Sequence, residues 1–238
     1  MDALILRFEE DVEEDVKPLS KDEQIGVRNL IGQLQQIREM ARKPMLMMFS
    51  TLDKNGFESQ FLSFFQNVTI EIEVLKAWKT KGIKPKKSCR WNARRILPVK
   101  IAEVYSWEKY IDAPHNIEEL HNMRISIKRL RYSMEDFLSI TGRSLGALQV
   151  WVNFQKLLGD IHDCDISQDI LTGYLKNFSQ EENENTNAIG LNTLIQQYQQ
   201  TCQERYQEFL ERWADLKEKD FRGNLLKIIE NRSTTKIK

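Results

Sequence analysis

The chain has 238 residues, of which 41% are hydrophobic and 29% charged, and its 35 Lys or Arg residues balance 35 Asp or Glu residues. These values are ordinary for a globular protein with a buried core, and the neutral total excludes a wholly cationic surface. No stretch approaches the length of about 18 uncharged apolar residues that a membrane span needs, so we expect none. With only 10 Gly and 5 Pro, and few runs of Val, Ile and Thr, the sequence predicts an all-α protein built from helical bundles.

The neutral total hides an uneven distribution of charge. Residues 1–24 carry nine acids against three bases, whereas residues 76–100 carry ten Lys or Arg and no acid. A concentrated basic block in a neutral chain indicates a local anion site. Three Cys residues without paired spacing, and an N-terminus without a basic leader, indicate a reducing, cytoplasmic location.

The first 20 residues predict an acidic arm or a short helix. Ser20 and Glu23 have the spacing of a capping box and start a helix over residues 21–43. Pro44 interrupts this helix before a short continuation over 45–52. After a turn that ends at Gly56, an apolar run predicts a long, central, buried helix over residues 57–79.

A basic loop is predicted over residues 79–87, where Gly82 and Pro85 break regular structure. A helix over residues 88–111 follows, with a kink at Pro98. Arg90 and Arg94 lie near the start of this helix.

Residues 116–140 predict the amphipathic helix around which the chain is organised. Its apolar residues recur at steps of three and four: Leu120, Met123, Ile127, Leu130, Met134, Phe137 and Leu138. A polar stripe beside them, here named the basic column, consists of His121, Arg124, Lys128, Arg131 and Tyr132. Arg129 lies toward the far edge of this stripe. From its first residue to Arg131 the basic column rises about 15 Å.

The rest of the chain also predicts helices. Gly142 ends the amphipathic helix, and another helix follows over residues 144–158. Gly159 then predicts a tight turn, and Asp163 a cap for a helix over 165–178. The remaining elements are a polar loop over 179–187, a long helix over 188–219, a last helix over 221–230 and a basic tail over 232–238.

The basic column has the charge pattern of an anion site. Like charges at i,i+4 repel by about 0.2–0.5 kcal/mol on a helix surface. Arg124, Lys128 and Arg131 nevertheless stack above one another, with only Glu135 one turn later. This arrangement lowers stability unless an anion lies there. A solvated helix face is the alternative that the residues alone leave open.

The run from His121 to Tyr132, H-x-x-R-x-x-x-K-R-L-R-Y, resembles the signature helix of the CHAD family, the conserved-histidine α-helical domain. The segment 114–120 is similar to the family's lead-in, and Leu158-Gly159 followed by an Asp looks like its second marker. The resemblance implies a single domain over residues 21–238, with two pseudo-symmetric helical halves, about 21–112 and 113–231, around a basic cavity. Only the second half carries a clear signature.

The resemblance further implies that the domain binds inorganic polyphosphate without catalysing a reaction. It implies no metal or cofactor, and an association with polyphosphate granules. The binding residues that it implies are His121, Arg124, Lys128, Arg129, Arg131 and Tyr132, with Arg90 and Arg94 from the preceding helix.

A metal-dependent phosphohydrolase of the HD type is an alternative function. His121, the pair His162-Asp163 and Asp169 or a later Asp supply its ligand types, and metal-activated water would attack a phosphoester. However, Arg124 and Lys128 would repel a dication beside His121. The basic column also has no carboxylate, the usual ligand of hard metals.

Single-stranded nucleic-acid binding is a second alternative. The basic block 76–100 would follow the backbone, with Trp78, Trp91 and Trp107 as stacking platforms. Tryptophans in a helical bundle are more typical of a core, however. Tyr132 is the one aromatic residue of the basic column, which favours bare phosphate over stacked bases, so we do not expect nucleic acid as the partner.

Overall fold

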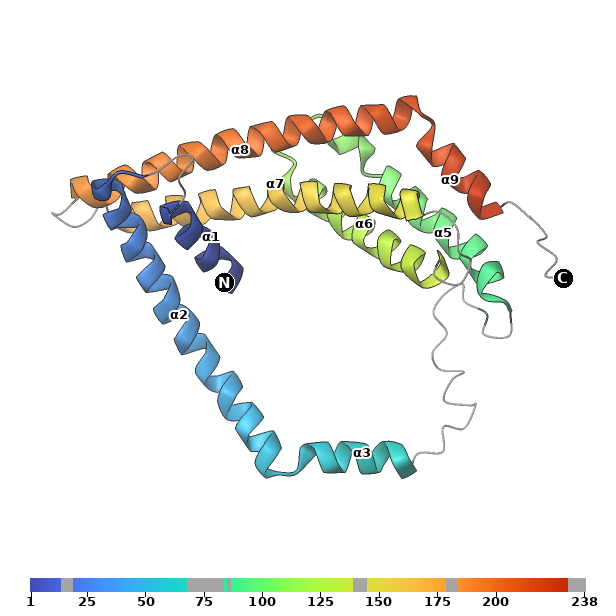
Figure 1. The fold of residues 1–238 in the computed structure, drawn as a ribbon, viewed down its shortest axis with the longest axis horizontal. Coiled ribbons are helices and arrows are strands. Elements are labelled where there is room, and N and C mark those ends of the chain that lie inside the picture. Colours follow the sequence, from blue (N-terminus) through green and yellow to red (C-terminus); the bar gives the residue numbers. More distant parts are fainter. Residues whose placement is uncertain (14–18, 68–83, 85–86, 139–144, 179–183, 231–238) are drawn as a thin grey trace. The chain divides into compact units, whose positions relative to one another are not determined.

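The computed structural model describes residues 1–13, 19–67, 84, 87–138, 145–178 and 184–230. All regular secondary structure in these residues is helical, which confirms the predicted all-α class. The elements labelled in Figure 1 are α1 (Asp2–Glu13), α2 (Lys21–Lys54), α3 (Phe57–Asn67), α5 (Cys89–Tyr105), α6 (Ile117–Leu138), α7 (Leu145–Phe178), α8 (Glu184–Glu218) and α9 (Phe221–Glu230). Within the described ranges, no helix is long and apolar enough to span a bilayer.

Several predicted elements lie outside the described residues. These are most of the basic loop 79–87, the part of the helix 57–79 that follows Asn67, the helix stop at Gly142 and the basic tail 232–238. The predicted halves and the cavity between them stay predictions.

The chain divides into two compact units, and unit 1 comprises Met1–Trp78 and Ser167–Tyr198. In unit 1, α1 packs against α2 and buries Ile5, Phe8 and Val12. The ring of Phe8 meets Tyr198 edge-on, with 6.2 Å between centroids, and the Tyr198 hydroxyl donates to Asp11 at 2.5 Å. The first residues therefore form the short helix, one of the two predicted alternatives, and this helix belongs to the core of its unit.

The start of α2 is a tightly packed point of unit 1. The predicted capping box is confirmed, because Glu23 N donates to Ser20 Oγ at 3.3 Å and Ser20 N donates to Glu23 Oε2 at 2.7 Å. Glu23 Oε1 also accepts from the hydroxyl of Thr193 in α8 at 2.6 Å. Gly190 lies so close that a Cβ there would overlap the Glu23 carbonyl.

Two predictions in unit 1 are wrong. The helix α2 continues through Pro44 to Lys54, because the residues around the proline, such as Ala41, Met45 and Leu46, are strong helix formers. The first part of the predicted buried helix, α3, is exposed instead: Phe57, Phe61 and Phe64 are 49%, 50% and 62% accessible. An apolar run alone does not say which element covers it.

Unit 2 comprises Lys79–Ile166 and Gln199–Lys238 and holds the larger apolar core. Trp151 of α7 and Trp213 of α8 are buried, and Phe154 meets Phe209 and Trp213 edge-on with centroids 6.0 and 5.7 Å apart. The helix α5 packs against α6 and α9. It ends at Tyr105 and a short 3-10 helix, η1 (Glu108–Tyr110), follows, so the predicted helix to residue 111 is shorter than expected.

The helix α7 is continuous from Leu145 to Phe178, where the sequence predicts two helices separated by a turn. The predicted turn at Gly159 and the helix cap at Asp163 are both wrong, because both residues lie inside Leu145–Phe178. The long helix α8 likewise begins at Glu184, within the predicted polar loop. Gly159 is small because the side chain of Arg124 packs against it, as described below.

Candidate anion site

The helix α6 positions the basic column, as predicted. It begins after Asn116, whose amide donates to the Tyr110 carbonyl at 2.8 Å. Glu118 and Glu119 lie in its first turn, where negative charge complements the helix dipole. Five residues of its apolar stripe are no more than 5% exposed and fix the rotation of the helix: Leu120, Met123, Ile127, Leu130 and Met134.

The helix α7 forms a second wall beside this column. The rings of His121 and His162 lie 4.5 Å apart between centroids, tilted by 46°. One turn along α6, Arg124 packs over Gly159: its Nε lies 3.3 Å from the position that a Cβ at Gly159 would take. From the first contact to the second, residue numbers rise along α6, from His121 to Arg124, and fall along α7, from His162 to Gly159. The two helices are therefore antiparallel here.

Polar atoms along this contact are buried without a hydrogen-bond partner among the described residues. They are Nδ1 of His121, Nε of Arg124 and Nδ1 of His162. Leaving such an atom unpaired costs about 1–3 kcal/mol, and native proteins pair most buried polar groups. A cluster of unpaired atoms beside cations therefore has the chemistry of a site that a polar ligand completes.

Positive charge and burial both act on His121. Burial lowers the pKa of His121 below its ordinary value of 6.5, and the charges of His162 and Arg124 lower it further. Burial and these charges therefore favour the neutral form of the imidazole in the protein without a ligand.

The outer part of the basic column faces solvent. Lys128 and Tyr132 are exposed, and both Arg131 and Lys128 lie over the Tyr132 ring, at 4.6 and 5.8 Å from its centroid. Arg131 Nε also lies 3.3 Å from Glu135 Oε1. The tyrosine thus holds two cations close together despite their repulsion.

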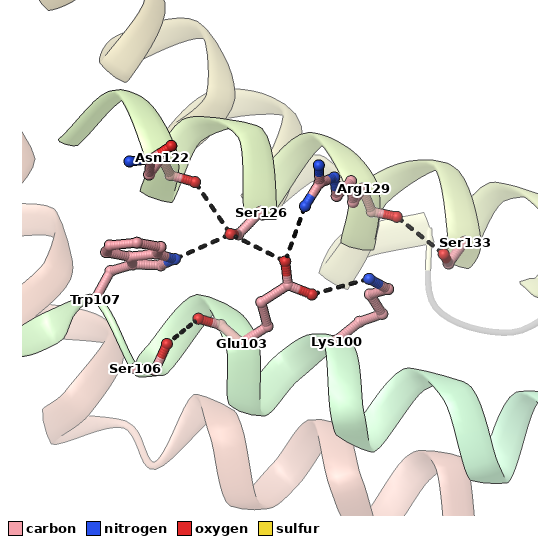
Figure 2. A network of polar contacts seen from close by, with 8 residues as sticks. All are labelled: Lys100, Glu103, Ser106, Trp107, Asn122, Ser126, Arg129 and Ser133. Atoms are coloured by element: carbon pink, nitrogen blue, oxygen red, sulfur yellow. Dashed lines mark hydrogen bonds and ion pairs between the residues drawn. The ribbon is translucent and has the colours of Figure 1, made fainter. Parts of the chain in front are cut away.

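Arg129 points to a different partner, as Figure 2 shows. Its guanidinium donates to Glu103 of α5 at 3.3 Å, and Lys100 donates to the same carboxylate at 2.8 Å. Ser126 donates to Glu103 at 3.4 Å and accepts from Trp107 Nε1 at 3.0 Å. Burial raises the pKa of Glu103, but the bonds and charges of Lys100 and Arg129 outweigh it and hold the pKa below 4.5. Arg129 therefore joins α6 to α5 and lies apart from the His121–His162 pair.

The two arginines of the preceding helix are also placed in unit 2. Arg94 Nε donates to the carbonyl of Ile229 in α9 at 3.3 Å, which ties α5 to α9. Arg90 lies one turn earlier and is partly buried. Their part in anion binding stays a prediction.

The residues that the two alternative functions would use have other contacts in the structure. Trp91 is partly buried, and Lys84 and Arg95 lie over its ring at 5.5 and 5.0 Å. Trp107 bonds Ser126, and Trp78 lies outside the described residues. Among the residues that the structure describes, no three His, Cys, Asp or Glu side chains gather as metal ligands.

Sequence reasoning missed the contribution of α7. The sequence predicts a turn at Gly159 and gives His162 a part only in the hydrolase alternative, whereas both residues lie against the basic column. Their three-residue spacing matches that of His121 and Arg124, and this matched spacing on two helices is the signal that indicates their pairing.

The fold and the site define an all-helical protein with a ladder of cations on one helix, packed along one edge against a second helix. The model of the CHAD domain matches residues 1–172, so the chain belongs to the CHAD-domain family. The matched range includes the whole basic column, Gly159 and His162, and ends inside α7. No curated protein and no solved structure gives a significant match.

Proposed function

We propose that the protein binds inorganic polyphosphate along α6 without catalysing a reaction. The observation that carries this proposal is the basic column itself, where buried polar atoms of His121 and Arg124 lie unpaired beside that of His162 in α7. Membership of the CHAD family supports the choice of polyphosphate, because binding this polymer is the family's general role. The basic cavity, the cytoplasmic location and an association with polyphosphate granules belong to the same proposal.

The binding mechanism is electrostatic. Arg124, Lys128 and Arg131 pair with phosphate oxygens through charge-assisted hydrogen bonds, which are shorter and stronger than neutral ones. The Tyr132 hydroxyl adds a further donor. Because Arg124 is packed over Gly159 before the ligand arrives, little side-chain entropy is lost when it binds. Arg129 contributes mainly long-range charge, since Glu103 already holds its guanidinium.

Binding should weaken steeply with salt. If about four cations each displace a condensed counterion, the slope of log affinity against log salt is near −3, taking about −0.7 per contact as for single strands. The measurement is a titration of long-chain polyphosphate at several NaCl concentrations. A slope near zero would contradict an electrostatic mechanism.

The substitution Gly159→Ala should weaken binding by about threefold to tenfold, the loss of roughly 1 kcal/mol from one charged contact. The new methyl group comes within 3.3 Å of Arg124 Nε, so the guanidinium must move. Alanine favours a helix over glycine by about 0.8–1.0 kcal/mol, so the fold should persist. Gly146→Ala, in the same helix with open space around it, is the matched control, and equal affinities of the two variants would show that Arg124 needs no such support.

The alternatives are separated by one set of samples. Phosphate release from polyphosphate that requires a divalent metal would indicate a hydrolase and direct attention to His121, His162 and Asp163. An oligonucleotide that binds with base dependence, and that polyphosphate does not displace, would indicate nucleic-acid binding. The charge of Arg124 beside the two imidazoles favours an anion over a dication at this point.

A further inference from the structure

We propose that the His121–His162 pair takes up a proton when a polyanion binds, so that the site holds its ligand more tightly as the pH falls toward 6. This inference rests on the proposed polyphosphate site and adds its regulation. It assigns to His162 a function in binding that the basic column of α6 does not include.

The geometry of the pair carries the proposal. The two rings lie 4.5 Å apart between centroids and come from facing positions on α6 and α7. Each ring has a buried Nδ1 without a partner among the described residues. A neutral imidazole offers one donor and one acceptor, whereas a protonated imidazole offers two donors. Protonation therefore changes one ring of the pair into a form that serves an anion with both nitrogens.

The charges around His121 oppose its protonation in the free protein. His162 faces His121 from α7, and Arg124 lies one turn along its own helix; both lower the pKa of His121. Of the carboxylates near His162 in α7, Asp165 accepts from Cys202 of α8 and Asp160 acts on Arg205. Asp163 adjoins His162 in the chain, and Glu118 lies one turn before His121.

An anion reverses this balance. Its negative charge neutralises Arg124 and favours the charged form of a nearby imidazole, so the pKa of the pair is higher in the complex than in the free protein. The complex then binds more protons than its parts, and affinity rises as pH falls. The window begins near the pKa of the complex and closes at the free-state pKa of His121, which lies below 6.5. Two cationic rings at this distance repel each other, so we expect about one proton per site.

The experiment measures proton uptake when long-chain polyphosphate binds to the full chain. Calorimetric titrations at one pH, in buffers of different ionisation enthalpy, give the number of protons taken up. Within the window we expect uptake of up to about one proton and an affinity that rises up to about tenfold for each pH unit. Internal phosphate groups of a long chain do not titrate in this range, so the uptake reports on the protein.

Three variants locate the proton. His121→Gln and His162→Gln should each reduce the uptake, and in His162→Gln the free-state pKa of His121, followed by NMR, should rise toward 6.5 because a repelling charge is removed. His115→Gln is the control, because His115 is exposed and is the one His of the three in the chain that lies outside the pair. It should take up protons like the wild type.

The outcomes distinguish this inference from the proposed function. Tight binding with no proton uptake and no pH dependence overturns the proton coupling and leaves the polyphosphate site standing. Uptake that persists in both His121→Gln and His162→Gln, or that disappears in His115→Gln, also overturns it. Failure of the wild type to bind polyphosphate overturns the proposed function itself.

Discussion

Replacing Arg124 and Lys128 together by alanine should weaken polyphosphate binding by a factor of about 100 or more. Each cation forms charge-assisted hydrogen bonds worth about 1.5–3 kcal/mol, and every 1.4 kcal/mol is about tenfold in affinity. The fold should persist, because the apolar stripe that anchors α6 is untouched. Thermal stability should stay the same or rise slightly, since removing stacked cations relieves about 0.2–0.5 kcal/mol of repulsion per pair.

The control for this variant must lose the same charge from the same unit. Arg205→Ala with Arg212→Ala meets this requirement, because both arginines lie on α8 and pair with Glu208, at 2.9 and 2.5 Å. It should keep most of the affinity. If the control loses as much affinity as the site variant, the attraction is general to the surface. If the site variant unfolds far below the wild type, the basic column has a structural role instead.

Gly190→Ala should destabilise unit 1 by about 1–3 kcal/mol, toward the upper end of the usual cost of overpacking. A Cβ at this position overlaps the backbone carbonyl of Glu23. The backbone of Glu23 cannot rotate out of the way as a flexible side chain can, so the first turns of α2 and α8 must separate. The hydrogen bond from Thr193 to Glu23 should weaken as they do.

This effect should be local to unit 1 and measurable there. Trp91, Trp107, Trp151 and Trp213 belong to unit 2, so tryptophan fluorescence reports mainly on unit 2. Amide hydrogen exchange around Gly26–Leu34, the range that contains the buried residues of α2, reports on unit 1 and should accelerate. Gly32→Ala is the control, because nothing lies within 4 Å of a Cβ there, and alanine should slow exchange. Unchanged protection in Gly190→Ala would mean that the two helices adjust without cost.

The parts of the fold that sequence reasoning predicted depend on local physics. The helix α6, its apolar stripe and the cap at Ser20 follow from side-chain periodicity and from hydrogen bonds within three residues. The same periodicity placed five residues of the basic column on one stripe. These features need no knowledge of what packs against the helix.

The parts that sequence reasoning missed depend on contacts between distant residues. Glycine is common in turns, so Gly159 suggests one. Its small size is needed for a different reason, because Arg124 lies against it from another helix. Arg129 has the sequence position of a ligand residue, and its contact with Glu103, 26 positions earlier, is not predictable from the pattern of its own helix. In both cases the contact that gives the residue its surroundings comes from another helix.

The contact between Arg129 and Glu103 gives α6 a one-sided charge. Glu103 acts as an internal counterion that balances one of the two positive charges of Lys100 and Arg129 along this edge of the helix. In the basic column, Arg131 pairs with Glu135, whereas Arg124 and Lys128 form no ion pair among the described residues. A flexible polyanion attracted by the cations of the basic column would run parallel to the axis of α6 and would not wrap around the helix.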